Sequence, residues 1–270
     1  IRVKIYLKEN TKMASQDILT IDFGTQSVRT GIFDAKGNVL AMEKEKYAPA
    51  YFSTLPNYAE QDPNYYFDCL CACTQRLAKE HADLLKNVAG ITLTCFRDSA
   101  VLLDQDMKVI RPMILWLDQR TAECRKKLPA YQRAIFRLIG KTDTINFNRK
   151  RSVGNWLAEN EPENWAKVKK FVNVSTYFIY LLTGELKDSA SNQSGHYPIN
   201  DKKREWDKNP EKDLTGQIFN LKKSMLCTLV PEGLKMFACG SDKSCETLGL
   251  GVINDRVGAL SYGTASSIET

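Results

Sequence analysis

Apolar and polar residues alternate soon after the start of the chain. The stretches ILTID (18–22) and VRTGIFD (28–34) are rich in β-branched residues, and FGTQS lies between them. A third short stretch, at Val39 and Leu40, follows the turn DAKGN. Alternation with a period of two is typical of strands that bury one face. The pattern therefore predicts an antiparallel meander of three strands at the beginning of a domain.

Helical spacing replaces this alternation after residue 62. Asp62 is followed by Pro63, and these residue types are common at the N-cap and the first position of a helix. Apolar residues then recur every three or four positions as far as Leu84, which predicts one amphipathic helix. Further strands are expected over 88–96, 99–103, 234–239 and 257–262, and further helices opening at 116–120, filling most of 128–182, and over 243–250. Strands that alternate with helices indicate an α/β protein.

The composition is that of a folded globular protein. Of the 270 residues, 43% are hydrophobic and 26% are charged, and 38 basic against 32 acidic residues give a net charge of +6. This excess is spread along the chain, which favours an anionic ligand such as a nucleotide over a nucleic acid. The basic runs 149–151 and 202–204 are interpreted as solvated loops. A nucleic-acid partner is therefore not expected. No stretch approaches the length of a membrane span, so a membrane partner is not expected either.

The cysteines and the first residues say little about chemistry. Eight cysteines and two histidines are present, but no two cysteines form a C-x-x-C pair, so a zinc site is not expected. Unpaired cysteines are typical of the cytoplasm, which is the expected location. The chain begins at Ile1, whereas Met13 resembles a natural start, so residues 1–13 are expected to be a leader and residues 14–270 the folded part.

Candidate chemistry begins at a tight turn between the first two strands. The turn follows Asp22 and consists of Gly24, Thr25, Gln26 and Ser27. Backbone N–H groups and hydroxyls in such a turn can hold a polyphosphate, and an aspartate at the strand end can reach Mg²⁺ through water. The same sequence is also compatible with an ordinary turn.

Two further segments strengthen the phosphate hypothesis. Gly263 and Thr264 again follow a strand, and two such turns far apart in one chain argue against coincidence. Asp242 follows another strand in the sequence Gly-Ser-Asp. A carboxylate there can accept the proton of a hydroxyl that attacks phosphorus, or it can simply cap the next helix.

Four segments together resemble the FGGY carbohydrate kinases, which include xylulokinase and glycerol kinase. They are DFGTQSVR (22–29), WLDQR (116–120), CGSDK (239–243) and GTAS (263–266), in the order of the family's signatures. The resemblance implies a ribonuclease H-like domain of the actin/Hsp70/sugar kinase superfamily, with a mixed five-stranded sheet flanked by helices and carrying helical insertions. It implies ATP-dependent phosphorylation of a sugar or polyol hydroxyl, with Asp242 as catalytic base, Mg²⁺ held through water by Asp22, and the two Gly-Thr turns as phosphate loops.

The sugar-binding positions implied by the resemblance follow two strands. They are Arg97, Asp98, Trp116, Asp118 and Arg120. Phe96 departs from the family pattern, which often has glutamine there, and a surface ion pair is the alternative interpretation of Arg97 and Asp98.

The resemblance implies a second, nucleotide-binding domain, which this sequence is expected to lack. The chain is therefore expected to be the N-terminal, sugar-binding half and to be inactive alone. A homodimer is possible. The alternative is a non-catalytic actin-like relative that binds sugar or nucleotide without turnover.

Overall fold

The computed structural model describes residues 17–189, 192, 199–200, 205–206, 218–220, 234–238, 240–252, 258–262 and 266–269. The expected leader and the turn at Gly263 and Thr264 lie outside these residues. The strands are β1 (Asp17–Phe23), β2 (Ser27–Phe33), β3 (Val39–Lys46), β4 (Glu60–Gln61), β5 (Val88–Cys95), β6 (Ala100–Leu103), β7 (Met113–Ile114), β8 (Lys170–Asn173), β9 (Ile199–Asn200), β10 (Glu205–Trp206), β11 (Ile218–Asn220), β12 (Lys235–Ala238), β13 (Ala259–Tyr262) and β14 (Ser266–Glu269). The helices are α1 (Pro63–Glu80), α2 (Ala82–Leu85), α3 (Ala130–Leu138), α4 (Thr142–Arg151), α5 (Val153–Asn160), α6 (Pro162–Lys167), α7 (Val174–Thr183) and α8 (Asp242–Gly249).

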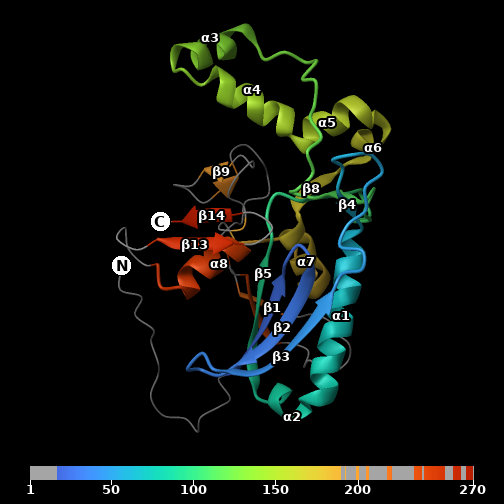
Figure 1. The fold of residues 1–270 in the computed structure, drawn as a ribbon. Coiled ribbons are helices and arrows are strands. Elements are labelled where there is room, and N and C mark those ends of the chain that lie inside the picture. Colours follow the sequence, from blue (N-terminus) through green and yellow to red (C-terminus); the bar gives the residue numbers. More distant parts are fainter. Residues whose placement is uncertain are drawn as a thin grey trace.

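A mixed sheet lies at the centre of the molecule (Figure 1). Its strand order is β11-β12-β5-β1-β2-β3. β1, β2 and β3 form the predicted antiparallel meander, whereas β5 runs parallel to β1, and β12 runs parallel to β5. The five strands from β12 to β3 are the mixed sheet expected of a ribonuclease H-like domain, and the short β11 extends its edge by antiparallel pairing.

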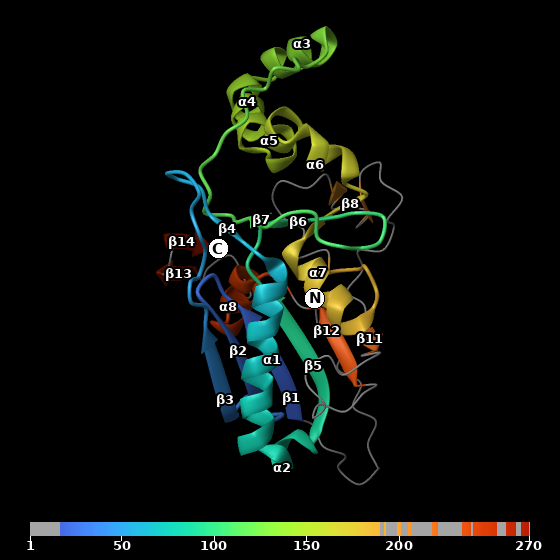
Figure 2. The same cartoon turned by 90° about the vertical axis from the view of Figure 1, so that its right-hand side faces the viewer.

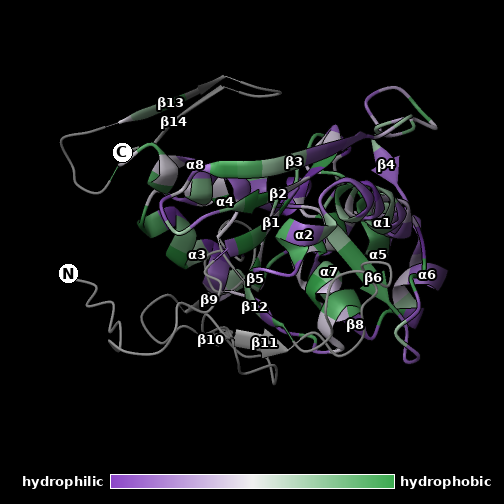
Figure 3. Cartoon of the chain, turned by 90° about the horizontal axis from the view of Figure 1, so that it is seen from below, coloured by the Kyte–Doolittle hydropathy of each residue, from purple (hydrophilic) through white to green (hydrophobic). Residues whose placement is uncertain are grey.

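Each face of this sheet is covered by different helices. Leu19, Ile21 and Phe23 alternate along β1 and are essentially fully buried. On their face, Phe23 stacks on Phe178 of α7 with ring centroids 4.0 Å apart, and α1 packs on β2 and β3. Figures 1 and 3 show α1 and α7 on this side and α8 on the other. Because α1 and α7 seal one face, the opposite face near α8 is where polar side chains of β1 can meet a ligand.

Local signals explain where α1 and α7 begin and end. Asp62 is the N-cap of α1 and its side chain accepts a hydrogen bond from the N–H of Asn64, as predicted. α7 ends at Gly184, which adopts a left-handed conformation with φ 75°. The predicted strand over 88–96 and the helix after residue 241 are confirmed as β5 and α8.

A smaller sheet lies beyond the end of the main sheet. Its strand order is β4-β7-β6-β8, and β8 pairs antiparallel with β6. The prediction that helices fill most of 128–182 did not include a strand, but the short segment 170–173 is paired as β8 before α7 begins. The helical insertion α3–α4 projects away from both sheets (Figure 2).

Within the described residues, no helix combines the length and apolarity needed to cross a membrane.

The helix predicted to open at 116–120 does not form. The segment is irregular, and the next helix, α3, begins only at Ala130. Asp118 explains the difference, since its carboxylate accepts hydrogen bonds from the backbone N–H groups of Ala59 (2.6 Å) and Arg120 (2.8 Å). Such side-chain bonds to the backbone compete with helix formation.

Candidate active site

Three parallel strands bring two aspartates to the same end of the main sheet. Asp22 lies near the end of β1, and Asp242 is the first residue of α8, just after β12. Thr94 of β5 lies between them, and its hydroxyl donates to the carbonyl of Gly240 at 2.9 Å. The pKa of the Cys95 thiol is raised well above its usual value, first by burial and then by the negative charges of Asp242, Asp188 and Asp22. All three carboxylates therefore lie near enough to Cys95, the last residue of β5, to act on its charge.

The turn after β1 is held tightly by its own backbone. The N–H of Gly24 donates to the carbonyl of Ser27 at 3.0 Å, and a Cβ at Gly24 would lie only 3.3 Å from that oxygen. Asp22 pairs with Arg29 at 3.2 Å. Burial raises the pKa of Asp22, and the charge of Arg29 partly opposes the rise. A carboxylate in this state gains from a further cation.

Asp242 is not the cap of its helix. The N-cap of α8 is Ser241, whose side chain accepts from the N–H of Ser244. Burial raises the pKa of Asp242, while the N–H and the charge of Lys243 and the charge of Arg97 lower it. The helix-cap interpretation of Asp242 is therefore wrong, and the carboxylate is a partly desolvated acid at the sheet end.

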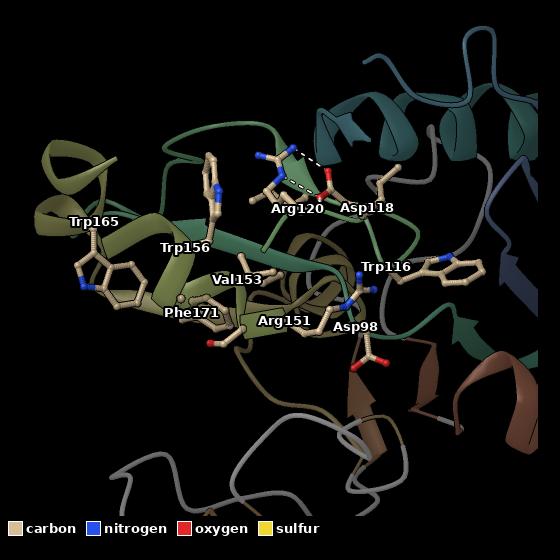
Figure 4. A pocket seen from close by; sticks show the side chains of 14 residues that line it. Asp98, Trp116, Asp118, Arg120, Arg151, Val153, Trp156, Trp165 and Phe171 are labelled. Carbon is tan, nitrogen blue, oxygen red and sulfur yellow. Dashed lines mark hydrogen bonds and ion pairs between the residues drawn. The ribbon is translucent and has the colours of Figure 1, made fainter. Parts of the chain in front are cut away.

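A pocket of about 270 Å³ lies next to this end of the sheet (Figure 4). Four of the five predicted sugar-contacting residues line it, namely Asp98, Trp116, Asp118 and Arg120. Arg97 is not among its lining residues. Asp98 has φ 58°, an uncommon left-handed conformation for a residue other than glycine. The pocket and the aspartates are joined by Trp116, whose indole Nε1 donates to Thr25 Oγ1 at 3.0 Å.

Asp118 and Arg120 are committed to each other. Arg120 Nε and Nη2 donate to the two Asp118 oxygens at 2.8 and 2.7 Å, and Nη2 also contacts Glu60 Oε1 at 2.7 Å. The Arg120 guanidinium lies 3.8 Å from the ring centroid of Tyr58 and 4.6 Å from that of Trp156. The remaining nitrogen, Nη1, is buried without a hydrogen-bond partner. These side chains therefore stabilise the wall of the pocket, and their polar atoms are not exposed to a ligand.

Sequence reasoning missed the far side of the pocket. Arg151, Trp156, Trp165 and Phe171 line it from α4, α5, α6 and β8. The interpretation of residues 149–151 as a solvated loop is wrong, because they form the end of α4 and Arg151 is half-buried in the pocket. A basic run shortly before Trp156 was the available signal, but nothing local indicated which residue turns inward. Residues 202–204 lie outside the described part of the chain.

Comparison with known proteins agrees with this geometry. Residues 18–252 match the model of the "FGGY family of carbohydrate kinases, N-terminal domain". The chain belongs to this family. Among curated members, xylulose kinase of Lactococcus lactis is 28% identical over 93% of this chain and 52% of its own length. Glycerol kinase of Thermococcus onnurineus is 30% identical over 70% of this chain and 39% of its own.

Solved structures of family members share the fold. Xylulose kinase from Rhodospirillum rubrum superposes with a TM-score of 0.73 at 20% identity, over 93% of this chain and 54% of that one. Glycerol kinase of Plasmodium falciparum, solved with ADP, superposes with a TM-score of 0.72 at 18% identity, over 93% of this chain and 53% of that one. The chain thus spans about half the length of the relatives it matches.

Proposed function

We propose that this chain is the sugar-binding half of a carbohydrate kinase that transfers the γ-phosphoryl group of ATP to a sugar or polyol hydroxyl. The observation that carries the proposal is Asp242. It is desolvated, it does not cap its helix, and it shares the sheet end with Asp22 beside a pocket of suitable size. The membership of the family and the xylulose and glycerol kinase relatives support the same chemistry.

Each role follows from position. The sugar lies in the pocket, where Asp98 and Trp116 contact it. Arg97 precedes Asp98 in the chain, and its charge acts on Asp242. The Asp242 carboxylate accepts the proton of the attacking hydroxyl. The hydroxyl oxygen forms its bond to the γ-phosphorus as the bond to the β,γ-bridging oxygen breaks, and ADP leaves. Asp118 and Arg120 act as positioning residues, because their polar atoms are bonded to each other and to Glu60 or are covered by protein.

The turn at Gly24, Thr25, Gln26 and Ser27 is proposed to hold the polyphosphate, together with the turn at Gly263 and Thr264, which remains a prediction. Mg²⁺ fits beside Asp22, since only its Oδ2 is bound to Arg29 and carboxylate oxygens are preferred ligands of this ion. When bound with ATP, Mg²⁺ neutralises phosphate charge. Asp22 would hold the ion through water and orient it toward the phosphates.

The relatives are about twice as long as this chain, so we infer that a second domain completes the nucleotide site. We also place the protein in the cytoplasm, where ATP is available. The described cysteines support a reducing location, because Cys69, Cys73, Cys95 and Cys124 are free thiols.

Two measurements test the proposal. Calorimetry with this chain should detect binding of a polyol or sugar, and sugar-dependent ADP release should appear once the second domain is present. The Asp242→Asn variant should bind sugar as the wild type does but release ADP about 10²- to 10⁴-fold more slowly. Sugar binding without any ADP release by the wild type would instead indicate the non-catalytic relative.

A further inference from the structure

The pocket contains a positive charge that no described residue pairs with. Arg151 lines the pocket from the last residue of α4 and is half-buried. Among the residues the structure describes, no side chain or backbone group forms a hydrogen bond or an ion pair with its guanidinium. Figure 4 shows it extending toward the part of the pocket that Asp98 and Trp116 line.

The other arginine of the pocket is in the opposite situation. Two nitrogens of Arg120 are bound to Asp118 and Glu60, and its side chain is only 3% exposed. Its Nη1 is covered by protein, and the guanidinium lies against the rings of Tyr58 and Trp156, so a ligand in the pocket does not reach Nη1. Asp118 is equally enclosed, at 2% side-chain exposure. Among the described residues that line the pocket, the charged groups that a ligand can meet are therefore Asp98 and Arg151.

These two groups favour different parts of a ligand. A carboxylate such as Asp98 accepts hydrogen bonds from hydroxyls, whereas a guanidinium donates and pairs best with an anionic oxygen. A neutral sugar that fills the pocket would exclude water from Arg151 and leave its charge without a counterion, which is unfavourable. Trp156, Trp165 and Phe171 also line the pocket, and their aromatic rings suit the C–H groups of a carbon chain.

We propose that the preferred substrate is a sugar acid, an open-chain polyhydroxy carboxylate whose carboxylate pairs with Arg151. Its hydroxyl end then lies toward Asp98 and Asp242, where phosphoryl transfer takes place. This inference rests on the proposed function, and it assigns the substrate class and the residue that selects it.

The test compares ligands that differ in one group. D-gluconate and D-glucitol have the same carbon chain and differ only by a carboxylate in place of a terminal CH₂OH. Calorimetry on this chain should show gluconate binding about 10- to 100-fold more tightly, the range expected for one charge-assisted hydrogen bond. Gluconate binding should also weaken as salt is raised, because an ion pair is screened.

Variants at the end of α4 identify the residue responsible. Arg151→Gln should abolish the preference for gluconate while glucitol binding changes little, and Arg151→Lys should keep most of it. Lys150→Gln is the matched control, since it removes the same charge from the neighbouring, exposed position and should change neither affinity. Circular dichroism spectra confirm that each variant is folded.

The possible outcomes separate the two proposals. Equal or tighter binding of glucitol, D-xylulose or xylitol by the wild type overturns the sugar-acid inference and leaves the kinase proposal standing. A preference for gluconate that survives in Arg151→Gln overturns the assignment to Arg151. If none of these ligands binds at millimolar concentration, both the inference and the sugar-binding role of this chain are wrong.

Discussion

The indole Nε1 of Trp116 donates a 3.0 Å hydrogen bond to the hydroxyl of Thr25, a residue 91 positions away in the chain. Trp116 lines the pocket, and Thr25 lies in the turn that follows Asp22. The backbone N–H of Trp116 is also fixed, since it donates to Ser99 Oγ at 3.0 Å. One side chain thus connects the wall of the sugar pocket to the proposed phosphate turn.

A double-mutant cycle measures this connection. Trp116→Phe removes the donor, and Thr25→Val removes the acceptor while keeping its shape. We expect the two changes to be coupled by about 1 kcal/mol in the free energy of unfolding, as for one neutral hydrogen bond. Urea unfolding of the wild type, both single variants and the double variant gives this coupling directly. Strict additivity would show that the bond contributes nothing to the fold.

The activity of the enzyme with its second domain should depend on pH through Asp242. Burial raises the pKa of this base above that of an ordinary aspartate, and a base must be deprotonated to accept a proton. Activity should therefore fall as the pH is lowered through the raised pKa. An ordinary aspartate has a pKa of about 4, and the acidic limb of kcat/KM should lie above that value. An acidic limb at or below that range would contradict the role of Asp242.

The same desolvation should make Asp242 unfavourable for stability at neutral pH. Because its pKa is higher in the folded than in the unfolded state, the folded state loses stability as the pH rises through these values. Asp242→Asn carries no such charge, so its stability relative to the wild type should increase from acidic to neutral pH. Urea unfolding at several pH values checks the sign, and a difference that decreases with pH would contradict it.

Arg97 should act on both the sugar and the base. Its positive charge lowers the pKa of Asp242, so Arg97→Ala should move the acidic limb of the pH profile upward. Contacts made equally in ground and transition states change KM more than kcat, so KM should also rise more than kcat falls. Arg97→Lys retains the charge and should leave the limb in place. An unchanged pH profile together with unchanged sugar affinity would show that Arg97 acts on neither the sugar nor Asp242.

The buried ion network at Arg120 should be critical for folding. Arg111 adds a second cation to Glu60 at 2.5 Å, so Arg120→Met leaves Asp118 and part of Glu60 uncompensated in a buried site. We expect a loss of about 3–5 kcal/mol in the free energy of unfolding. Arg125→Met is the control, because Arg125 is 64% exposed and pairs with the exposed Glu123, so its effect should stay within about 0.5 kcal/mol. Equal effects for the two variants would contradict the prediction.

The sequence by itself determined the elements whose signals are local. The β-branched alternation of residues 18–34 required a strand pair, and Asp62 with Pro63 fixed the start of α1. The order of the Gly-Thr turn, the WLDQR segment and Asp242 was enough to indicate the family and thus the fold. These features depend on residues that are close to one another in the sequence, so a single sequence is enough to predict them.

Only the tertiary structure decided which polar residues face the ligand. The WLDQR segment does not form a helix, because the Asp118 carboxylate accepts a hydrogen bond from the backbone N–H of Ala59, 59 positions away. The same carboxylate also pairs with the Arg120 side chain. Arg151 is one of three consecutive basic residues, yet it is the one that lines the pocket, because α4 ends there and its last residue turns toward the pocket. Such choices depend on contacts between distant segments, and a charge pattern along one helix does not contain them.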